Sequence, residues 1–461
     1  MFLMLKNKLQ APAQWIRNVL LVCDKAASRY ETAIYWGCGI LYKFMLDAIY
    51  IWAASPQYAY AGLLYTPVSW KYFISLALYL GLFAFLPKNE KNAVGFLLHL
   101  QFVYTVAPLL SFYALANGST RYILMVSVCV LLQTWILRRP KASDGAVHIT
   151  GIRSYVTVAL GALTIFALAV PVLYNGFGGL KVFDFAYIYE MRANATYPPG
   201  FSYLFNWMQK VIVPFAVLYF LHAKKYRWCI LCVLLQIVFY MESGWKFTLF
   251  ILVPVIAIYV FSKTGHLLKL MYAGLVVLLL LVLICFRLDR IGGVSSLGPQ
   301  LNALIPIRAL FIPADNKFDF YECFRVFPHT FFSDGMIGKL LGLSYPYAAS
   351  LGQVIYAYTG GTFLESNSNT GYLGEAYAQM GFVGMLLMSL LLTAILRGIQ
   401  NYANKENFGV LIAMFSVFMI LLNDNALFTT LLTNGMLVAF VLVFIYFSSS
   451  SKGDPHGIQR L

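Results

Sequence analysis

Most of the polar side chains that could do chemistry lie in two long segments of an otherwise apolar chain, residues 175–203 and 287–375. The second segment mixes carboxylates, amides and arginines with many aromatic rings. Aromatic faces stack on the C–H surfaces of sugars, and carboxylates and amides bind sugar hydroxyl groups. The residues that we expect to contact a glycan are Glu190, Tyr321 and Asn369. The alternative is that the second segment is an amphipathic cap that packs on the helices beneath it.

A basic residue also stands in a tight turn between two short apolar stretches. The turn consists of Glu242-Ser-Gly-Trp-Lys246, and Glu242 lies one helical turn before Lys246. Because the flanking stretches are short, we expect this turn to lie within the outer half of a membrane. Lys246 would then be well placed to meet an anionic head group that is attached to a lipid.

The sequence contains none of the common metal and nucleotide motifs. There is no HExxH, no DxD and no paired CxxC in a loop, and no Walker A or GxGxxG pattern in a cytoplasmic segment large enough to bind a nucleotide. Arginine can stabilise a diphosphate leaving group without a metal, because its planar fork of donors matches phosphate oxygens. Preorganised charge of this kind can supply a large share of the lowering of the activation barrier in a transfer reaction. We therefore expect no metal ion and no cofactor.

The composition excludes a soluble globular domain. Hydrophobic residues make up 61% of the 461 residues and charged residues only 11%, whereas about 25% of a typical soluble protein is charged. One core could not hide this much apolar surface. A net charge of +15 would suggest a nucleic-acid partner in a soluble protein. In a membrane protein the same excess must first be tested as a signal of orientation.

Apolar stretches long enough to cross a membrane as helices recur along the whole chain. The sequence predicts an all-α polytopic membrane protein with about twelve transmembrane helices, forming one integral membrane domain over residues 1–461. The segments 175–203 and 287–375 are predicted to be periplasmic loops, and the larger one is expected to be partly helical. The predicted spans are 33–53, 70–86, 93–114, 122–137, 155–174, 204–221, 228–241, 247–261, 270–286, 376–396, 408–422 and 427–447.

Basic residues between these spans concentrate on one side. The positive-inside rule places that side, with both chain termini, in the cytoplasm. This side accounts for almost all of the basic excess, so the net charge gives no reason to expect a nucleic-acid partner. The first 31 residues contain no apolar core followed by a small-residue cleavage site, so no removable signal peptide is expected.

A few ionisable residues fall inside the predicted spans, where charge is costly. Lys43 and Asp47 are four residues apart on the first span, and we expect them to neutralise one another as a structural pair. Lys210 lies near the outer end of the sixth span and is expected to snorkel toward the membrane surface. His99 stands alone in the third span, and we expect it to be a hydrogen-bonded core residue.

Three stretches make the chain resemble the bacterial O-antigen polymerases (Wzy-type), which join oligosaccharide repeat units and are related to the O-antigen ligases. Arg192 followed by residues 203–214 resembles the family's outer loop leading into a Pro-containing span. Ser243-Gly-Trp-Lys246 resembles a hairpin that usually contains Ser-Arg-Gly or Gly-Ser-Arg. Residues 369–384 resemble the stretch that closes the large outer loop and enters the next span. The resemblance covers mainly residues 175–396 and implies a GT-C-like glycosyltransferase architecture.

The chain departs from this family pattern at two positions. The basic residue of the hairpin is Lys246 where the family more often has Arg, so the charge is kept but the bidentate fork is lost. In the ligases a His typically precedes the Gly-x-x-Gly step by about eleven residues, and here that place is taken by Thr370. The missing His favours a polymerase over a ligase and leaves the identity of the general base open.

The resemblance implies a location in the inner (plasma) membrane of a bacterium and a reaction on the periplasmic face of that membrane. A glycan on undecaprenyl diphosphate would be the donor, and a hydroxyl of an incoming lipid-linked repeat unit would attack its anomeric carbon. The residues expected to hold the two diphosphates are Arg192, Lys246 and one or more of Arg287, Arg290, Arg308 and Arg325. The residues expected to take or orient the acceptor proton are Glu375, His329 or Asp315. Expected partners are the lipid-linked oligosaccharide, membrane lipid, and a chain-length regulator and flippase of the same pathway.

Two other functions stay open at this point. An O-antigen ligase, which moves finished polymer onto an acceptor, belongs to the same enzyme class, and Thr370 argues against it. A flippase for lipid-linked oligosaccharides belongs to another class, and such proteins often show repeated halves and charges along a central path. This chain shows no clear repeat and few charges at mid-depth of its predicted spans. A purely structural membrane scaffold is the remaining possibility.

Overall fold

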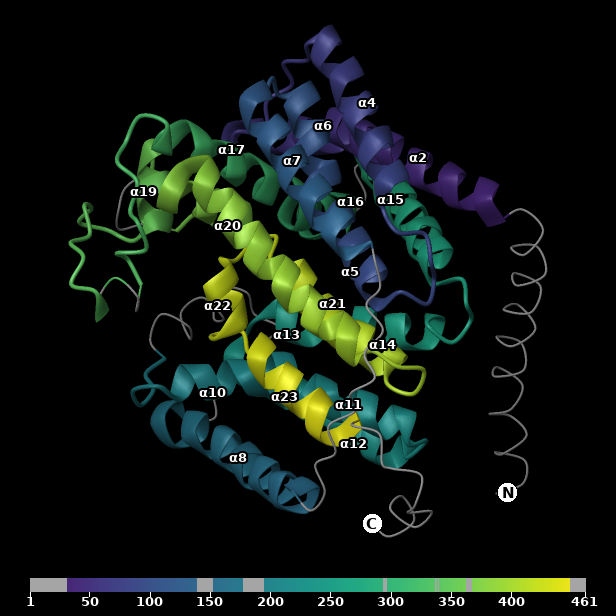
Figure 1. Cartoon of the computed structure of the whole chain (residues 1–461), viewed down its shortest axis with the longest axis vertical. Helices are drawn as coiled ribbons and strands as arrows, with labels where there is room; N and C mark the ends of the chain where they lie inside the picture. The colour runs from purple at the N-terminus through teal and green to yellow at the C-terminus, as the bar shows by residue number, and fades with distance from the viewer. Residues whose placement is uncertain are drawn as a thin grey trace. The chain divides into compact units, whose positions relative to one another are not determined.

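The structure is a computed structural model that describes residues 31–138, 152–176, 195–292, 297–335, 338, 340–361 and 367–447. Every regular element within these ranges is a helix (Figure 1). Nine of the described helices are long and apolar enough to cross a membrane. Three further predicted spans coincide with shorter apolar helices, Ser69–Phe85, Lys246–Phe261 and Phe408–Leu421. The all-helical, multi-pass membrane class is confirmed, and the count of twelve spans stays a prediction.

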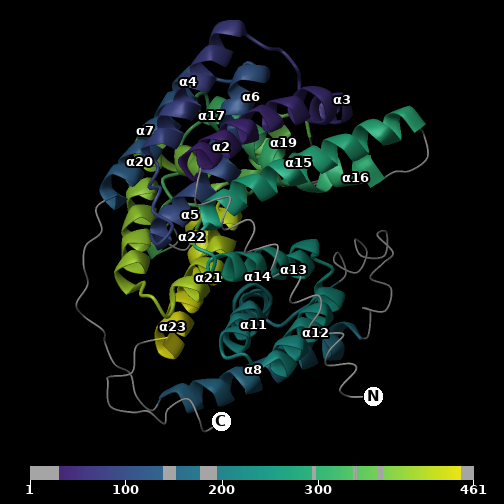
Figure 2. The ribbon, with the colours of Figure 1, turned by 90° about the vertical axis from the view of Figure 1, so that its right-hand side faces the viewer.

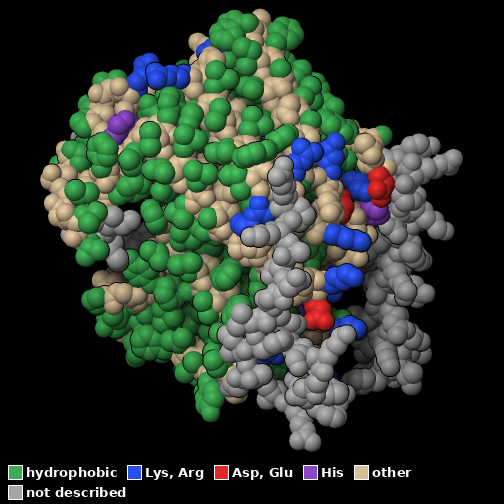
Figure 3. Space-filling model, viewed as in Figure 1, with side chains coloured by type: hydrophobic (Ala, Val, Ile, Leu, Met, Phe, Trp, Pro, Cys, Tyr) green, Lys and Arg blue, Asp and Glu red, His purple; other side chains and the backbone are tan. Residues whose placement is uncertain are grey.

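The surface of the described helices is apolar, as a lipid environment requires. Large hydrophobic side chains lie exposed along several helices, for example Phe73 at 70%, Val158 at 74% and Leu173 at 79%. Figure 3 shows one face, on which hydrophobic side chains predominate. Surface of this kind is stable against acyl chains and would aggregate in water.

The chain divides into two compact units, which are described separately. Unit 1 comprises Met1–Lys91, Phe102–Ser127 and Val260–Asp315, and unit 2 comprises Asn92–Gln101, Val128–Tyr259 and Asn316–Leu461. The single membrane domain over residues 1–461 and the membrane sidedness of the two long segments stay predictions.

Unit 1 is built mainly from long helices that pack on one another. Its main elements are α2 (Glu31–Ile49), η1 (Tyr50–Ala54), α4 (Ser69–Phe85), α6 (Ala107–Leu115), α15 (Leu267–Gly292), α16 (Leu297–Asn302) and η6 (Ala303–Phe311). Helix α15 packs along α2, and α4 packs against α6 (Figure 2). A ring cluster fills the core, in which Tyr35 stacks on Phe83 with 4.7 Å between ring centroids and Tyr272 meets Phe83 edge-on.

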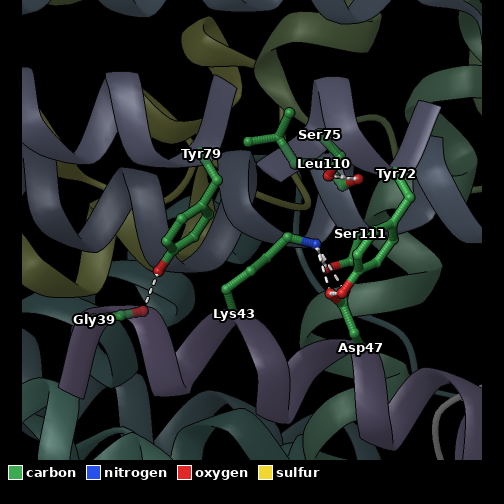
Figure 4. Close-up of polar contacts among 8 residues, drawn as sticks. All are labelled: Gly39, Lys43, Asp47, Tyr72, Ser75, Tyr79, Leu110 and Ser111. Atoms are coloured by element: carbon green, nitrogen blue, oxygen red, sulfur yellow. Dashed lines mark hydrogen bonds and ion pairs between the residues drawn. The ribbon is translucent and has the colours of Figure 1, made fainter. Parts of the chain in front are cut away.

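The predicted ion pair of the first span lies in this unit. The Lys43 ammonium is 2.7 Å and 3.0 Å from the two carboxylate oxygens of Asp47 and donates a third hydrogen bond to Ser111, 3.0 Å away. Tyr72 donates its hydroxyl to the same carboxylate (Figure 4). Lys43 is 1% exposed and Asp47 4%. The expected structural pair is confirmed, and it ties α2 to α4 and α6.

Helix α7 (Thr120–Leu137) runs from unit 1 into unit 2, as does α17 (Ile312–Phe324), and most of the remaining elements lie in unit 2. These are α5 (Ala93–Gln101), α8 (Ile152–Asn175), α10 (Phe201–Trp207), η5 (Met208–Ile212), α11 (Val213–His222), α12 (Tyr226–Ser243), α13 (Lys246–Phe250), α14 (Leu252–Phe261), α19 (Leu351–Tyr358), α20 (Tyr372–Tyr402), α21 (Phe408–Leu421), α22 (Leu427–Leu431) and α23 (Met436–Phe447). Within it, α11 packs on α12, and α21 packs on both α5 and α23. His99, on α5, is buried as expected.

Three candidate spans of unit 2 are interrupted. The Phe201–His222 span changes to a π-helix over Met208–Ile212. Helix α20 is broken at Met380 and Gly381, whose backbone angles are not helical. The Leu427–Phe447 span is broken between α22 and α23. Irregular backbone at membrane depth is tolerated where it is buried in protein or lines a polar cavity. The interruptions therefore direct attention to the polar groups beside them.

The segment 287–375 is partly helical, as predicted from the sequence. Helix α15 continues to Gly292, and α16, η6, α17 and α19 follow before α20 begins. Helix α19 begins with a capping box in which Ser350 and Gln353 bind one another's backbone N–H groups. At the other long segment, the Asn175 side chain binds the backbone of Thr196 at 2.9 Å and 3.2 Å. This amide joins the two ends of that segment.

Candidate functional site

A buried polar cluster surrounds the first two turns of α20 in unit 2. We call it the α20 site, and it consists of Thr330, Asp334, Glu375 and Gln379. Glu375 is 7% exposed and Gln379 is fully buried. The two residues are four apart, so their side chains lie on one face of the helix. The Gln379 amide nitrogen donates to Glu375 Oε1 at 3.0 Å and to Asp334 Oδ1 at 3.1 Å.

Gln379 organises this cluster through its carbonyl oxygen as well. That oxygen accepts from the Thr330 hydroxyl at 2.6 Å and from the Phe332 backbone N–H at 2.5 Å. All four hydrogen-bonding positions of the amide are therefore used. A fully satisfied amide fixes the groups around it, so Gln379 holds one oxygen of Glu375 in a defined position.

The second oxygen of the same carboxylate is different. Glu375 Oε2 is buried and has no hydrogen-bond partner among the described residues. A buried, unsatisfied carboxylate oxygen costs free energy, and native proteins retain few such groups, among them catalytic ones. The structure thus presents one anchored and one available oxygen on a single acid.

The break in α20 lies directly after this acid. The Thr330 N–H donates to Ala378 O at 3.1 Å, and the Phe331 N–H donates to Gln379 O at 3.0 Å. These two bonds satisfy carbonyls that the broken helix leaves without an intrahelical donor. Gly381 has a φ of +60°, and a Cβ there would lie 3.3 Å from His329 Nε2. Glycine therefore lets the helix turn against the His329 ring.

Aromatic rings line one side of the site. The Tyr321 ring packs on Tyr377 with 5.1 Å between centroids, and Tyr377 also meets His329 at 5.8 Å and Phe382 at 5.4 Å. Tyr321 is only 3% exposed. Its ring therefore forms part of a packed wall, and its predicted role in stacking on a sugar stays a prediction.

Lys317 was not singled out from the sequence, although it lies next to the start of α20. Its ammonium is fully buried and donates to the Asn423 backbone oxygen at 2.6 Å and to the Asn423 side chain at 2.9 Å. Burial lowers the pKa of the Lys317 amine, while the Asp424 carboxylate acts in the opposite direction. A Cβ on Gly371 would lie 2.9 Å from this ammonium, so the contact requires glycine there. The clue in the sequence was a lone lysine among acids and aromatics, 315–322.

Several predicted site residues therefore lie on or beside α20. Glu375 is a residue of the first turn of α20, and His329 contacts the backbone of the same helix at Ala378. No bond joins the two side chains directly among the described contacts. Asn369 is exposed, and its backbone oxygen accepts from Asn316 at 3.1 Å. Arg325 is exposed and pairs with Glu322 at 2.9 Å. Lys246 is exposed at the first residue of α13.

The other predicted residues lie elsewhere. Arg287, Arg290, Arg308 and Asp315 belong to unit 1. There Arg287 lies over the Trp52 ring at 5.4 Å and Arg290 over the Phe286 ring at 5.9 Å. Their predicted contacts with diphosphate stay predictions. Glu190 and Arg192 lie outside the described residues.

The arrangement at α20 suits proton transfer. An acid with one anchored and one available oxygen can accept a proton from a hydroxyl group placed against it. Within the ranges that the structure describes, no group of three or more His, Cys, Asp or Glu side chains could hold a metal ion.

No family model, curated protein or solved structure matches this chain.

Proposed function

We propose that this protein polymerises oligosaccharide repeat units carried on undecaprenyl diphosphate. The observation that carries the proposal is the Glu375 carboxylate, buried beside a helix break, with Oε1 bound by Gln379 and Oε2 without a partner among the described residues. Transfer to a sugar hydroxyl needs a base to remove that hydroxyl's proton. Glu375 has the position and the available oxygen for this task.

The reaction can be followed atom by atom. A hydroxyl of the incoming repeat unit donates its proton to Glu375 Oε2, and its oxygen forms a bond to the anomeric carbon of the growing glycan. The bond from that carbon to the diphosphate oxygen breaks, and undecaprenyl diphosphate leaves as an anion. Basic side chains stabilise the charge that develops on the leaving group. Among the described residues of unit 2, the candidates for this role are Lys246 and Arg325, and Arg192 remains a candidate outside the described residues.

The surroundings of the acid support this assignment. His329 lies against the helix break, with its Nδ1 3.3 Å from the Ala378 oxygen, and can position the acceptor sugar or share its proton. The exposed Asn369 side chain precedes α20 by three residues and can bind a sugar hydroxyl. We place the reaction on the periplasmic face of the inner membrane. The substrates are lipid-linked repeat units, and membrane lipid surrounds the protein.

A flippase for lipid-linked oligosaccharides is the second candidate, because one observation favours it. Three spans of unit 2 are interrupted, and broken helices frame substrate sites in many transporters. The catalytic proposal is preferred because the buried acid with an available oxygen serves a transfer reaction directly. Transport alone requires no such base.

One genetic experiment separates the candidate functions. The gene is deleted, and the surface glycan is separated by size. Loss of a polymerase leaves single repeat units on the acceptor, whereas loss of a ligase leaves long polymer on the lipid carrier. Loss of a flippase leaves no surface glycan and traps the lipid-linked unit inside the cell. Full-length chains on the surface of the deletion strain would refute the polymerase proposal.

A further inference from the structure

A second group of buried polar atoms joins two of the interrupted spans of unit 2. Lys210 lies in the π-helical stretch of the Phe201–His222 span, and its ammonium donates to Asn434 Oδ1 at 2.7 Å. Asn434 lies in the break between α22 and α23, two residues before α23 begins. The Trp207 ring N–H donates to Leu432 O at 2.8 Å and ties the same two breaks together.

The charge of Lys210 is not balanced within the described protein. No carboxylate among the described residues forms an ion pair with it, in contrast to Lys43 and Lys269. A lysine inside a span is costly unless a counter-charge or water reaches it. Snorkelling, the expectation from the sequence, does not account for its contact with the amide of a helix break.

Asn434 adds a donor that lacks an acceptor. An ammonium can only donate, so the amide oxygen must face Lys210. The amide nitrogen then has no hydrogen-bond partner among the described residues, although Asn434 is only 3% exposed. The 12-residue helix α23 begins next to it, and the first N–H groups of any helix lack intrahelical acceptors. The positive end of the helix dipole lies at this same end of α23.

Backbone geometry fixes these donors in place. Gly435 has a φ of +83°, and a Cβ there would lie 2.7 Å from Trp207 Cδ1 and 2.8 Å from Val211 Cγ2. Only glycine permits this close approach of the break to the π-helix. Lys210 is partly exposed, and Leu432 and Leu437, which flank Asn434 in the chain, are 47% and 49% exposed. A ligand can therefore reach the ammonium from the apolar surface of unit 2.

We propose that Lys210, Asn434 and the first turn of α23 bind a phosphate group carried by a lipid. The ammonium, the amide N–H₂ and the backbone N–H groups are all donors, and together they require an acceptor that bears negative charge. Phosphate or diphosphate supplies that charge, and the apolar surroundings favour the form attached to a hydrocarbon chain. That this lipid is the polyprenyl carrier of the repeat unit rests on the proposed function; the binding of phosphate does not.

Binding to the purified full-length protein in detergent micelles tests the proposal. The probes are farnesyl diphosphate, farnesol as the same chain without phosphate, and inorganic diphosphate. We expect farnesyl diphosphate to bind and farnesol to bind at least about tenfold more weakly. If inorganic diphosphate binds as tightly as farnesyl diphosphate, the anion site is supported, but its ligand is a free phosphate and not a lipid. Absence of binding by both diphosphates would overturn the proposal.

Variants separate this site from a structural role of Lys210. Lys210→Met should weaken diphosphate binding by about tenfold or more without lowering the melting temperature, because it removes an unbalanced charge. Lys210→Arg should restore binding, and Lys405→Met, at an exposed lysine of the same unit, should change nothing. Asn434→Asp supplies the missing carboxylate, so it should raise the melting temperature and abolish binding. Wild-type affinity in Lys210→Met would contradict the proposal, whatever the deletion phenotype shows.

Discussion

Each unit buries charged side chains, but the two units satisfy them differently. In unit 1 the Lys43 ammonium uses all three of its donors, and Tyr72 also binds the Asp47 carboxylate. In unit 2 Glu375 keeps one oxygen without a partner among the described residues, and Lys210 meets an amide instead of a carboxylate. The first arrangement is complete within the protein. The second requires something from outside.

This difference separates structural from functional charge inside a membrane protein. Breaking a buried ion pair is strongly destabilising, because the remaining charge has no compensation. An incomplete site carries its cost already, so the side chains that bear the unsatisfied groups, Glu375 and Lys210, should be replaceable with little loss of stability and large loss of function. The variants below test this contrast.

The largest effect on stability is expected at the ion pair of unit 1. Asp47→Leu leaves the Lys43 ammonium buried with only Ser111 as an acceptor among the partners described above. The free energy of unfolding should fall by about 3–5 kcal/mol, and the melting temperature of the purified protein should fall with it. The double variant Lys43→Met with Asp47→Leu should recover most of the loss, since no charge remains. A single variant as stable as the wild type would remove the structural role of the pair.

The organiser of the α20 site should show an intermediate effect. Gln379→Met removes hydrogen bonds to Glu375, Asp334, Thr330 and the Phe332 N–H, and each buried group left without a partner costs about 1–3 kcal/mol. We expect both a lower melting temperature and a loss of chain growth. Gln400→Met, on the last turn of the same helix, is the matched control and should leave chain growth intact. Full activity in Gln379→Met would show that the orientation of Glu375 is unimportant.

A smaller effect is expected at the glycine of the α22–α23 break. Gly435→Ala should cost about 1–2 kcal/mol for the left-handed backbone alone, and the contact with Trp207 adds to this. Gly200→Ala is the matched control, because Gly200 has a φ of +79° and open space around its Cβ position. The melting temperature should fall further in Gly435→Ala than in Gly200→Ala, and diphosphate binding should weaken only in the former. If the two variants have the same melting temperature and the same affinity for diphosphate, the close approach of Gly435 to Trp207 does not position Asn434.

The smallest effect concerns pH. Burial, and to a smaller extent the nearby Glu322 carboxylate, raise the pKa of Asp319 from 3.8 to about 7. The folded state therefore prefers the protonated acid, and this stabilisation is complete below about pH 3.8 and is lost as the pH rises to about 7. The melting temperature should fall over that window in the wild type, and Asp319→Asn should remove part of the fall. An unchanged pH profile in the variant would contradict the assignment.

The sequence was sufficient for features that depend on composition and local spacing. Mean apolarity predicted the helical membrane class, and the four-residue spacing of Lys43 and Asp47 predicted their pairing. Glu375 was named as a candidate acid because residues 369–384 resemble the stretch that enters a span in the O-antigen polymerases, and its role stays a prediction. The same spacing rule, applied to Glu375 and Gln379, would have identified the anchor of the acid as well.

The rest depended on tertiary contacts that local patterns do not encode. The break at Met380 and Gly381 lies in a run that is apolar enough to continue as a helix, and it forms where the chain at 330–331 supplies donors. Lys317 meets Asn423, which lies 106 residues further along the chain. Arg287, Arg290 and Arg308 were grouped with the site in the sequence analysis; they belong to unit 1, and their contact with diphosphate stays a prediction.

The most direct test of the account is chain growth by the Glu375→Gln variant. The purified protein in liposomes receives lipid-linked repeat units, and the products are separated by length. Glutamine keeps the size of the side chain but cannot take a proton, so the rate of chain growth should fall by roughly 10²–10⁴-fold at an unchanged melting temperature. A wild-type ladder of products from this variant would contradict the assignment of Glu375 as the base.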